Sequence, residues 1–174
     1  MAINQPLPIP DWPEIWMRQV YLISSKSKDN RTKIGAILVR DNRIISSGYN
    51  GFCRKLDDSV ESRYERPKKY SFFEHAERNA VYDCARRGVS TEGSTCVTNG
   101  IPCADCARGL IQAGIKSLLV HKQHEEMMVA MGLVKWIESA EHSIEMFKEL
   151  LIPIQFYDKV LGVRTLMDGK IIDL

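Results

Sequence analysis

The sequence has no long apolar run, and no stretch of its 174 residues could span a membrane. The segment Met1–Pro10 lacks the charged and then apolar layout of a signal peptide. The chain also lacks a large excess of either charge. Its net charge of +2 makes no strong case for the concentrated basic face that duplex nucleic acid requires. We therefore expect neither a membrane nor duplex nucleic acid as a partner. We expect a cytoplasmic protein, located in the host cytoplasm if the source is viral.

Cysteine is sparse as well. The five cysteines are an odd number, too few for a disulfide scaffold. Cys103 and Cys106 form a Cys-x-x-Cys pair, which in a reducing compartment indicates metal or redox chemistry more often than a structural bridge. For Cys53, Cys84 and Cys96 we expect packing or no particular role.

Apolar periodicity and turn residues predict alternating helices and strands. We expect an extended arm over 1–11 and a C-terminal tail over 159–174, a candidate for a subunit interface, with a small hairpin at Asp168-Gly169. The polar segment 48–70 is predicted to be a long loop. The predicted helices cover about 12–25, 73–87, 102–113, 125–132 and 135–151. The predicted strands cover 34–39, 43–47, 95–98, 117–121 and 154–157.

This order of elements predicts a single α/β domain over 1–174. The first two strands are joined by Asp41-Asn42, a hairpin turn signal, so they should be antiparallel. The five-stranded sheet should therefore be mixed.

Two short motifs carry the candidate chemistry. His75-Ala76-Glu77 and Pro102-Cys103-Ala104-Asp105-Cys106 both lie at predicted helix starts, where partial positive charge stabilises thiolates. Cysteines three apart share a helical face and can bind one ion, with a histidine as third ligand. Three protein ligands leave the fourth tetrahedral position to water, as in catalytic zinc sites. Glu77 could then accept a proton from that water.

Other interpretations of these motifs are weaker. A closed structural zinc site needs a fourth ligand, but His121, His124 and His142 stand in no second paired motif. A thioredoxin-like pair is disfavoured because its usual partner pattern is absent and proline precedes the first cysteine. His-x-Glu followed by Pro-Cys-x-x-Cys is the signature of zinc nucleobase deaminases, and the joint occurrence favours a catalytic zinc.

From about Ile15 to Tyr157 the sequence resembles the deoxycytidylate deaminase family, within the cytidine deaminase-like fold. The resemblance implies a three-layer α/β/α fold and hydrolytic deamination of dCMP to dUMP, which supplies dUMP for thymidylate synthesis. It also implies one Zn²⁺ per subunit bound by His75, Cys103 and Cys106, with Glu77 as the proton shuttle. The segments that carry it are 25–29 with 32–36, Gly48-Tyr49-Asn50-Gly51, 75–80, and 102–107 with 112–116.

The resemblance also implies substrate contacts. The Ala76 N–H would hold the cytosine carbonyl, Asn50 would bind the sugar, and Pro102 belongs to the substrate-binding set. Arg86 is a candidate phosphate ligand; it lies three helical turns, about 16 Å, beyond His75, so it would serve a neighbouring subunit's site. The alternatives are a turn role for Asn50 and a solvated surface position for Arg86.

Many relatives are hexamers activated by dCTP and inhibited by dTTP, so we expect a homo-oligomer, with a hexamer favoured. A regulatory nucleotide, with Mg²⁺, could bind the loops around 24–33 and 48–54; ordinary solvated lysines are the alternative. The candidate residues are Lys26, Lys28, Arg31, Gly48, Asn50 and Gly51. Some relatives carry a second zinc in the insert, but the segment 48–70 of this chain holds only Cys53 and no histidine, which predicts a single zinc. The loop Asn99-Gly100-Ile101 is one residue longer than the common form.

Two other functions stay open. One is another zinc deaminase, acting on dCTP, cytidine, a free base or RNA adenosine; the helix at 135–151 lacks the basic stripe that RNA binding should bring. The other is a non-catalytic zinc-binding assembly module, which would need neither Glu77 nor an open ligand position.

Overall fold

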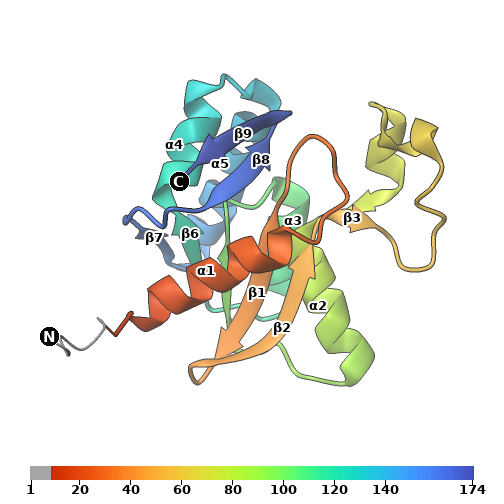
Figure 1. Ribbon diagram of the computed structural model, residues 1–174. Coiled ribbons are helices and arrows are strands. Elements are labelled where there is room, and N and C mark those ends of the chain that lie inside the picture. The colour runs from red at the N-terminus through yellow and green to blue at the C-terminus, as the bar shows by residue number, and fades with distance from the viewer. Residues whose placement is uncertain (1–8) are drawn as a thin grey trace, which may run out of the picture.

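The computed structural model of the protein describes residues 9–174 (Figure 1). Most of the arm predicted over 1–11 lies outside these residues. No helix within 9–174 is both long and apolar enough to cross a membrane. The helices are α1 (Trp12–Ser24), α2 (Ala76–Arg87), α3 (Ala104–Gln112), α4 (Lys122–Ala130) and α5 (Val134–Glu149). The strands are β1 (Gly35–Arg40), β2 (Arg43–Tyr49), β3 (Gly51–Phe52), β4 (Phe73–Glu74), β5 (Thr95–Thr98), β6 (Ser117–His121), β7 (Ile154–Tyr157), β8 (Arg164–Met167) and β9 (Lys170–Asp173).

The centre of the fold is a five-stranded sheet in the order β2-β1-β5-β6-β7. Strand β1 pairs antiparallel with both β2 and β5, whereas β5, β6 and β7 are parallel to one another. The mixed five-stranded sheet predicted from the sequence is confirmed. The carboxyl ends of β5 and β6 lie at the same edge, so the segments that follow them begin side by side.

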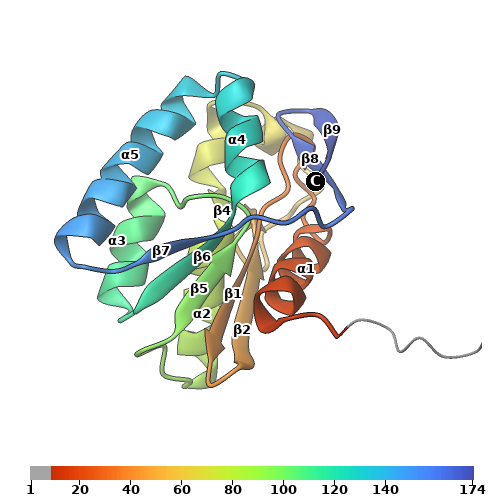
Figure 2. The same ribbon diagram turned by 90° about the vertical axis from the view of Figure 1, so that its left-hand side faces the viewer.

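Helices cover both faces of this sheet (Figure 2). Because side chains alternate along a strand, Ala36 and Leu38 of β1 pack against α2, α3 and α5, while Ile37 and Val39 pack on the other face with α1 and α4. The hairpin β8–β9 contributes Met167 to this second cluster. The result is three layers, with α2, α3 and α5 together on one side.

Both predicted hairpin turns are present. Asp41 and Asn42 have φ of 52° and 58°, the left-handed pair that a two-residue turn between twisted strands requires. Asp168 and Gly169 do the same between β8 and β9, with φ of 43° and 80°.

Several predicted boundaries or segments differ from the structure; α4, for example, begins at Lys122 and not at residue 125. Helix α2 begins at Ala76 and not at residue 73, because Phe73 and Glu74 form β4 and pair with β3. Helix α3 begins at Ala104, with Cys103 as its N-cap, so Pro102 precedes the helix. The segment 48–70 is not a uniform loop, since it contains β3 and the 3₁₀ helices η1 (Glu61–Tyr64) and η2 (Lys68–Ser71).

A buried ion pair fastens this insert, residues 53–72, to the rest of the fold. Asp29 is 3% exposed and its carboxylate contacts Lys69 Nζ at 2.5 Å. The same carboxylate group accepts hydrogen bonds from the backbone N–H of Arg31 and from the side-chain amide of Asn50. The insert projects beside β3 in Figure 1, yet its second 3₁₀ helix is held at the loop that precedes β1.

Gly48 allows α2 to lie directly on β2. A Cβ at this position would lie 2.2 Å from the carbonyl oxygen of Ala76 and 2.5 Å from the nitrogen of Ala80. Both are backbone atoms of α2, so a larger residue would push away the first turn of the helix.

We therefore expect Gly48→Ala to lower the free energy of unfolding by about 1–3 kcal/mol or more, the usual effect of overpacking. Urea denaturation of the purified protein measures this. Gly51→Ala is the matched control, because a Cβ there would meet no atom closer than 3.7 Å. Equal stability of the two variants would contradict the prediction.

Candidate active site

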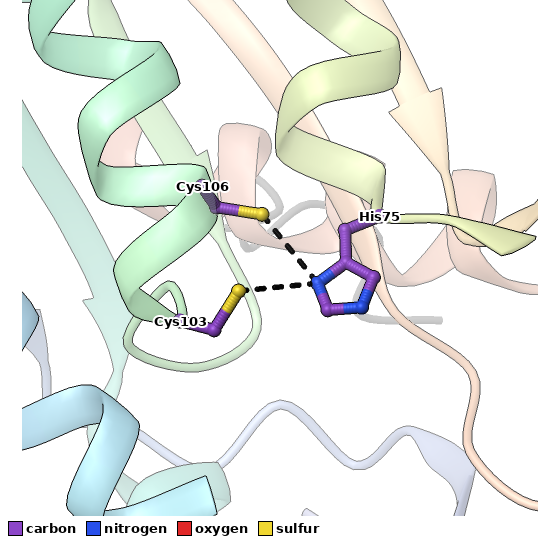
Figure 3. A group of neighbouring side chains, drawn as sticks. All are labelled: His75, Cys103 and Cys106. Carbon is purple, nitrogen blue, oxygen red and sulfur yellow. Dashed lines mark hydrogen bonds between the residues drawn. The ribbon is translucent and has the colours of Figure 1, made fainter. Parts of the chain in front are cut away.

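The starts of two neighbouring helices bring His75, Cys103 and Cys106 together. His75 is the N-cap of α2, Cys103 is the N-cap of α3, and Cys106 lies in the first turn of α3. Both N-cap residues have extended backbones, and neither side chain makes a capping hydrogen bond. The imidazole and the two thiols instead point toward one another from the two helices (Figure 3).

The distances fit a zinc ion. His75 Nδ1 lies 3.4 Å from Cys103 Sγ and 3.5 Å from Cys106 Sγ, and all three ligand atoms lie within 4.8 Å of one another. A tetrahedral zinc with ordinary bond lengths separates a nitrogen and a sulfur ligand by about 3.6 Å. One imidazole and two thiols are also a donor set that zinc prefers.

The two sulfur atoms are electrostatically unequal. The hydrogen bond between them lowers the pKa of Cys103 to about 4 and raises the pKa of Cys106. A lowered pKa favours the thiolate form of Cys103, which is the form of cysteine that binds metals.

Glu77 lies in the first turn of α2 beside this cluster. Its side chain is buried, at 3% exposure, and Oε2 accepts a hydrogen bond from the Cys106 thiol at 3.6 Å. Burial raises the pKa of Glu77. A raised pKa makes this carboxylate a stronger proton acceptor than an ordinary glutamate, as suits a general base.

Glu74 and Arg78 brace the start of α2. The Glu74 carboxylate accepts a hydrogen bond from the His75 N–H at 2.9 Å and another from Arg78 Nε at 2.7 Å. Glu74 therefore satisfies the backbone N–H of the N-cap residue itself. Arg78 also reaches Asp105 of α3 at 3.9 Å, so the two helix starts are linked by charge.

None of the three histidines considered as a fourth ligand lies in the cluster. Within residues 9–174, His75, Cys103 and Cys106 form the one group that could hold a metal. His121 contacts the Tyr21 hydroxyl at 2.7 Å, His124 is fully buried, and His142 is exposed on α5. A closed four-ligand site is therefore not formed by the described chain.

The candidate substrate-binding residues Ala76, Pro102 and Arg86 lie in different surroundings. Ala76 is buried, and as the first residue of α2 its N–H has no acceptor within the helix. Pro102 adjoins Cys103 and is held through its carbonyl by Ser143. Arg86 lies exposed in the last turn of α2, at the end opposite to His75.

Asn50 is a loop anchor in this structure. Its amide nitrogen donates to Asp29 Oδ2 at 3.0 Å and to the Thr32 carbonyl at 2.8 Å, and its amide oxygen accepts from the Ile34 N–H at 2.9 Å. These bonds fix the loop that leads into β1.

Most charges proposed for a second nucleotide site already have partners. Lys28 contacts Asp58 at 2.5 Å, and Arg31 contacts Asp168 at 2.8 Å. Lys26 is exposed. Gly48 packs on α2, and Gly51 lies in β3.

The sequence did not reveal the support that α4 and α5 give to this site. The Trp136 ring lies 5.7 Å from the His75 ring, inclined by 31°. Glu125, Ser139 and Ser143 hydrogen-bond the backbone of residues 101–104. The only signal in the sequence was their spacing: positions 136, 139 and 143 share one face of a helix.

Residues 10–122 match the family described as the cytidine and deoxycytidylate deaminase zinc-binding region. ComE operon protein 2 of Bacillus subtilis is 28% identical over 173 residues, covering 93% of this chain and 85% of that protein. Human deoxycytidylate deaminase is 32% identical over 115 residues, covering 63% of this chain and 64% of that protein. The enzyme of that name from Enterobacteria phage T4 is 30% identical over 145 residues, covering 61% and 75%.

A solved structure supports the fold assignment. The apo dCMP deaminase of cyanophage S-TIM5 superposes with a TM-score of 0.64 at 24% identity, covering 86% of this chain and all of that one. The structure of the same cyanophage protein in complex with dCMP and dUMP gives a TM-score of 0.63. The cytidine deaminase-like α/β fold implied by the resemblance is confirmed.

The geometry of the cluster predicts that Cys103→Ser loses the metal, because a serine hydroxyl is a poor zinc ligand at neutral pH. Elemental analysis of the purified protein should give about one zinc per chain for the native sequence and far less for the variant. Cys53→Ser, which alters an exposed cysteine outside the cluster, should retain zinc. Full zinc content in Cys103→Ser would rule out the assigned ligand set.

Proposed function

The chain belongs to the cytidine and deoxycytidylate deaminase family, and we propose that it is a zinc-dependent enzyme that hydrolyses dCMP to dUMP and ammonia. The observation that carries this proposal is the convergence of one imidazole, two sulfur atoms and the buried Glu77 carboxylate. A structural metal site needs no buried acid beside it. A deaminase needs one to move protons between water and the base.

The names of the relatives favour a deoxynucleoside monophosphate as substrate. Proteins named deoxycytidylate deaminase recur among them, from human to phage T4, and the similar cyanophage enzyme has been solved with dCMP and dUMP. We accordingly propose dCMP as the substrate in preference to dCTP, cytidine and RNA adenosine.

His75, Cys103 and Cys106 would hold the zinc. When bound, zinc supplies a Lewis acid that lowers the pKa of a coordinated water toward neutrality. The cluster lies at the N-termini of α2 and α3, where the partial positive charge of both helices favours negative charge on the ligands.

Glu77 carries the proton transfers in this proposal. It accepts a proton from the attacking water and delivers it to ring N3 as the oxygen adds to C4. The resulting tetrahedral carbon carries both the new hydroxyl and the amino group. Glu77 then takes the hydroxyl proton and passes it to the amino group, the C4–N bond breaks, and ammonia leaves. Water is consumed, the C4 carbonyl of dUMP is formed, and Glu77 is regenerated.

Ala76 and Pro102 would orient the base. The Ala76 N–H, free of an intrahelical acceptor, would donate to the cytosine carbonyl, and Pro102 would border the ring. The contact of Asn50 with the sugar stays a prediction, and it would require Asn50 to exchange one of its bonds to Asp29, Thr32 or Ile34.

Regulation and assembly stay predictions from the resemblance. They comprise activation by dCTP, inhibition by dTTP, Mg²⁺ bound with the regulatory nucleotide, a hexamer, a phosphate contact of Arg86, and a cytoplasmic location. For Lys28 and Arg31 to bind a triphosphate, their ion pairs with Asp58 and Asp168 would have to open.

Ammonia release from a panel of substrates tests the proposed function. We expect turnover of dCMP to exceed that of dCTP, cytidine and a structured RNA containing adenosine, with dUMP as the product by chromatography. Preference for another compound would reassign the substrate. If a zinc-loaded protein releases ammonia from none of them, the enzymatic proposal fails.

The Glu77→Gln variant should retain zinc but lose activity by about 10²–10⁴-fold or more, because the amide can no longer shuttle protons. Elemental analysis and the dCMP assay measure the two properties separately. Glu138→Gln, an exposed acid on α5, serves as control and should keep full activity. Substantial turnover by Glu77→Gln would refute its role.

A further inference from the structure

One face of α5 lies against the loop that carries Cys103. Trp136, Ser139, Ala140 and Ser143 follow one another at helical spacings of three, one and three residues, so they share this face. Ala140 packs in the core beneath it. All four lie beyond residue 122, where the match to the family ends.

The first backbone N–H groups of α3 receive no hydrogen-bond acceptor from the Cys103 side chain. An N-cap side chain usually accepts a hydrogen bond from one of the first backbone N–H groups of its helix. Cys103 occupies this position, but its thiol points to His75 and makes no capping bond. The sequence has thus placed a metal ligand where a capping residue would normally stand.

Ser139 of α5 supplies an acceptor from outside the helix, at the first helical residue and not at the second or third N–H that a capping side chain would reach. Its hydroxyl accepts a hydrogen bond from the Ala104 N–H at 2.9 Å, immediately after Cys103. Ser143, one turn further along α5, donates its hydroxyl to the Pro102 carbonyl at 2.7 Å, immediately before Cys103. The peptide groups on both sides of the ligand are therefore held by a single helix.

Two further contacts, one to the backbone of Ile101 and one to the ring of His75, add to the support from Ser139 and Ser143. Glu125 of α4 accepts a hydrogen bond from the Ile101 N–H, which extends the support by one residue. The Trp136 ring lies beside the imidazole of His75, the ligand from the other helix. Ser143 is fully buried, so no solvent would replace its bond to Pro102.

We propose that Ser139 and Ser143 are positioning residues that hold the Cys103 sulfur at the distance the metal requires. The proposal rests on the zinc site described under the proposed function and adds α5 as its supporting element. Partners that orient metal ligands typically change metal affinity by about 10–100-fold when they are removed. A purely structural role would instead lower stability and leave zinc affinity unchanged.

Zinc affinity, measured by competition with a chromophoric chelator, tests the proposal on the full chain. We expect Ser139→Ala and Ser143→Ala each to bind zinc about 10-fold or more weakly than the native protein. Ser139→Thr retains the hydroxyl and should lose less than the roughly 10-fold expected of Ser139→Ala. Cobalt-substituted protein gives a second readout, because the thiolate bands in its absorption spectrum should shift in both alanine variants.

Ser94→Ala is the matched control. Ser94 is fully buried and bonds the Thr91 carbonyl, but it precedes β5, at the strand end opposite to the metal loop. This variant should melt at a lower temperature while keeping native zinc affinity and the native cobalt spectrum.

Native zinc affinity in both Ser139→Ala and Ser143→Ala would overturn the proposal, as would a loss no larger than that of Ser94→Ala. If Ser143→Ala does not fold, the partly exposed Ser139 and its threonine variant decide the question. A native protein that binds no zinc at all is a different result, because it would overturn the proposed function itself.

Discussion

The site depends on the packing of α2 and α3 on the same face of one sheet. Each helix begins with a residue whose backbone is extended and whose side chain is free of capping. Because the two starts are adjacent, His75 meets Cys103 and Cys106 without any strained segment between them. Gly48 contributes to this arrangement, since only a residue without a Cβ lets α2 lie so close to β2.

Removing the caps from two helices has a cost, and neighbouring elements offset it. Glu74 serves the His75 end, while Ser139 and Ser143 serve the Cys103 end. The chemistry at the cluster and the stability of the two helix starts are therefore separate tasks, carried by different side chains. This division explains how ligands can occupy positions that usually belong to serine, threonine or aspartate.

Much of this could be predicted from the sequence, and the failures have physical causes. The His-x-Glu and Cys-x-x-Cys spacings located the cluster because both motifs are local. Turn chemistry at Asp41-Asn42 and Asp168-Gly169 is equally local. The start of α2 was predicted three residues early because Phe73 pairs with Phe52, a contact across twenty-one positions that periodicity cannot reveal. Ser139 and Ser143 were missed for the same reason, since polar residues on an amphipathic helix look solvated until the partner loop is known.

The short ladder between β3 and β4 has a consequence for how the protein can vary. Gly51 pairs with Glu74 and Phe52 with Phe73, so the insert leaves and rejoins the fold at neighbouring points. The entropy of closing a loop rises only slowly with its length. Apart from the ion pairs of Lys69 with Asp29, Asp58 with Lys28 and Arg66 with Asp168, the insert can therefore vary in length and sequence while His75 stays in register with the cysteines.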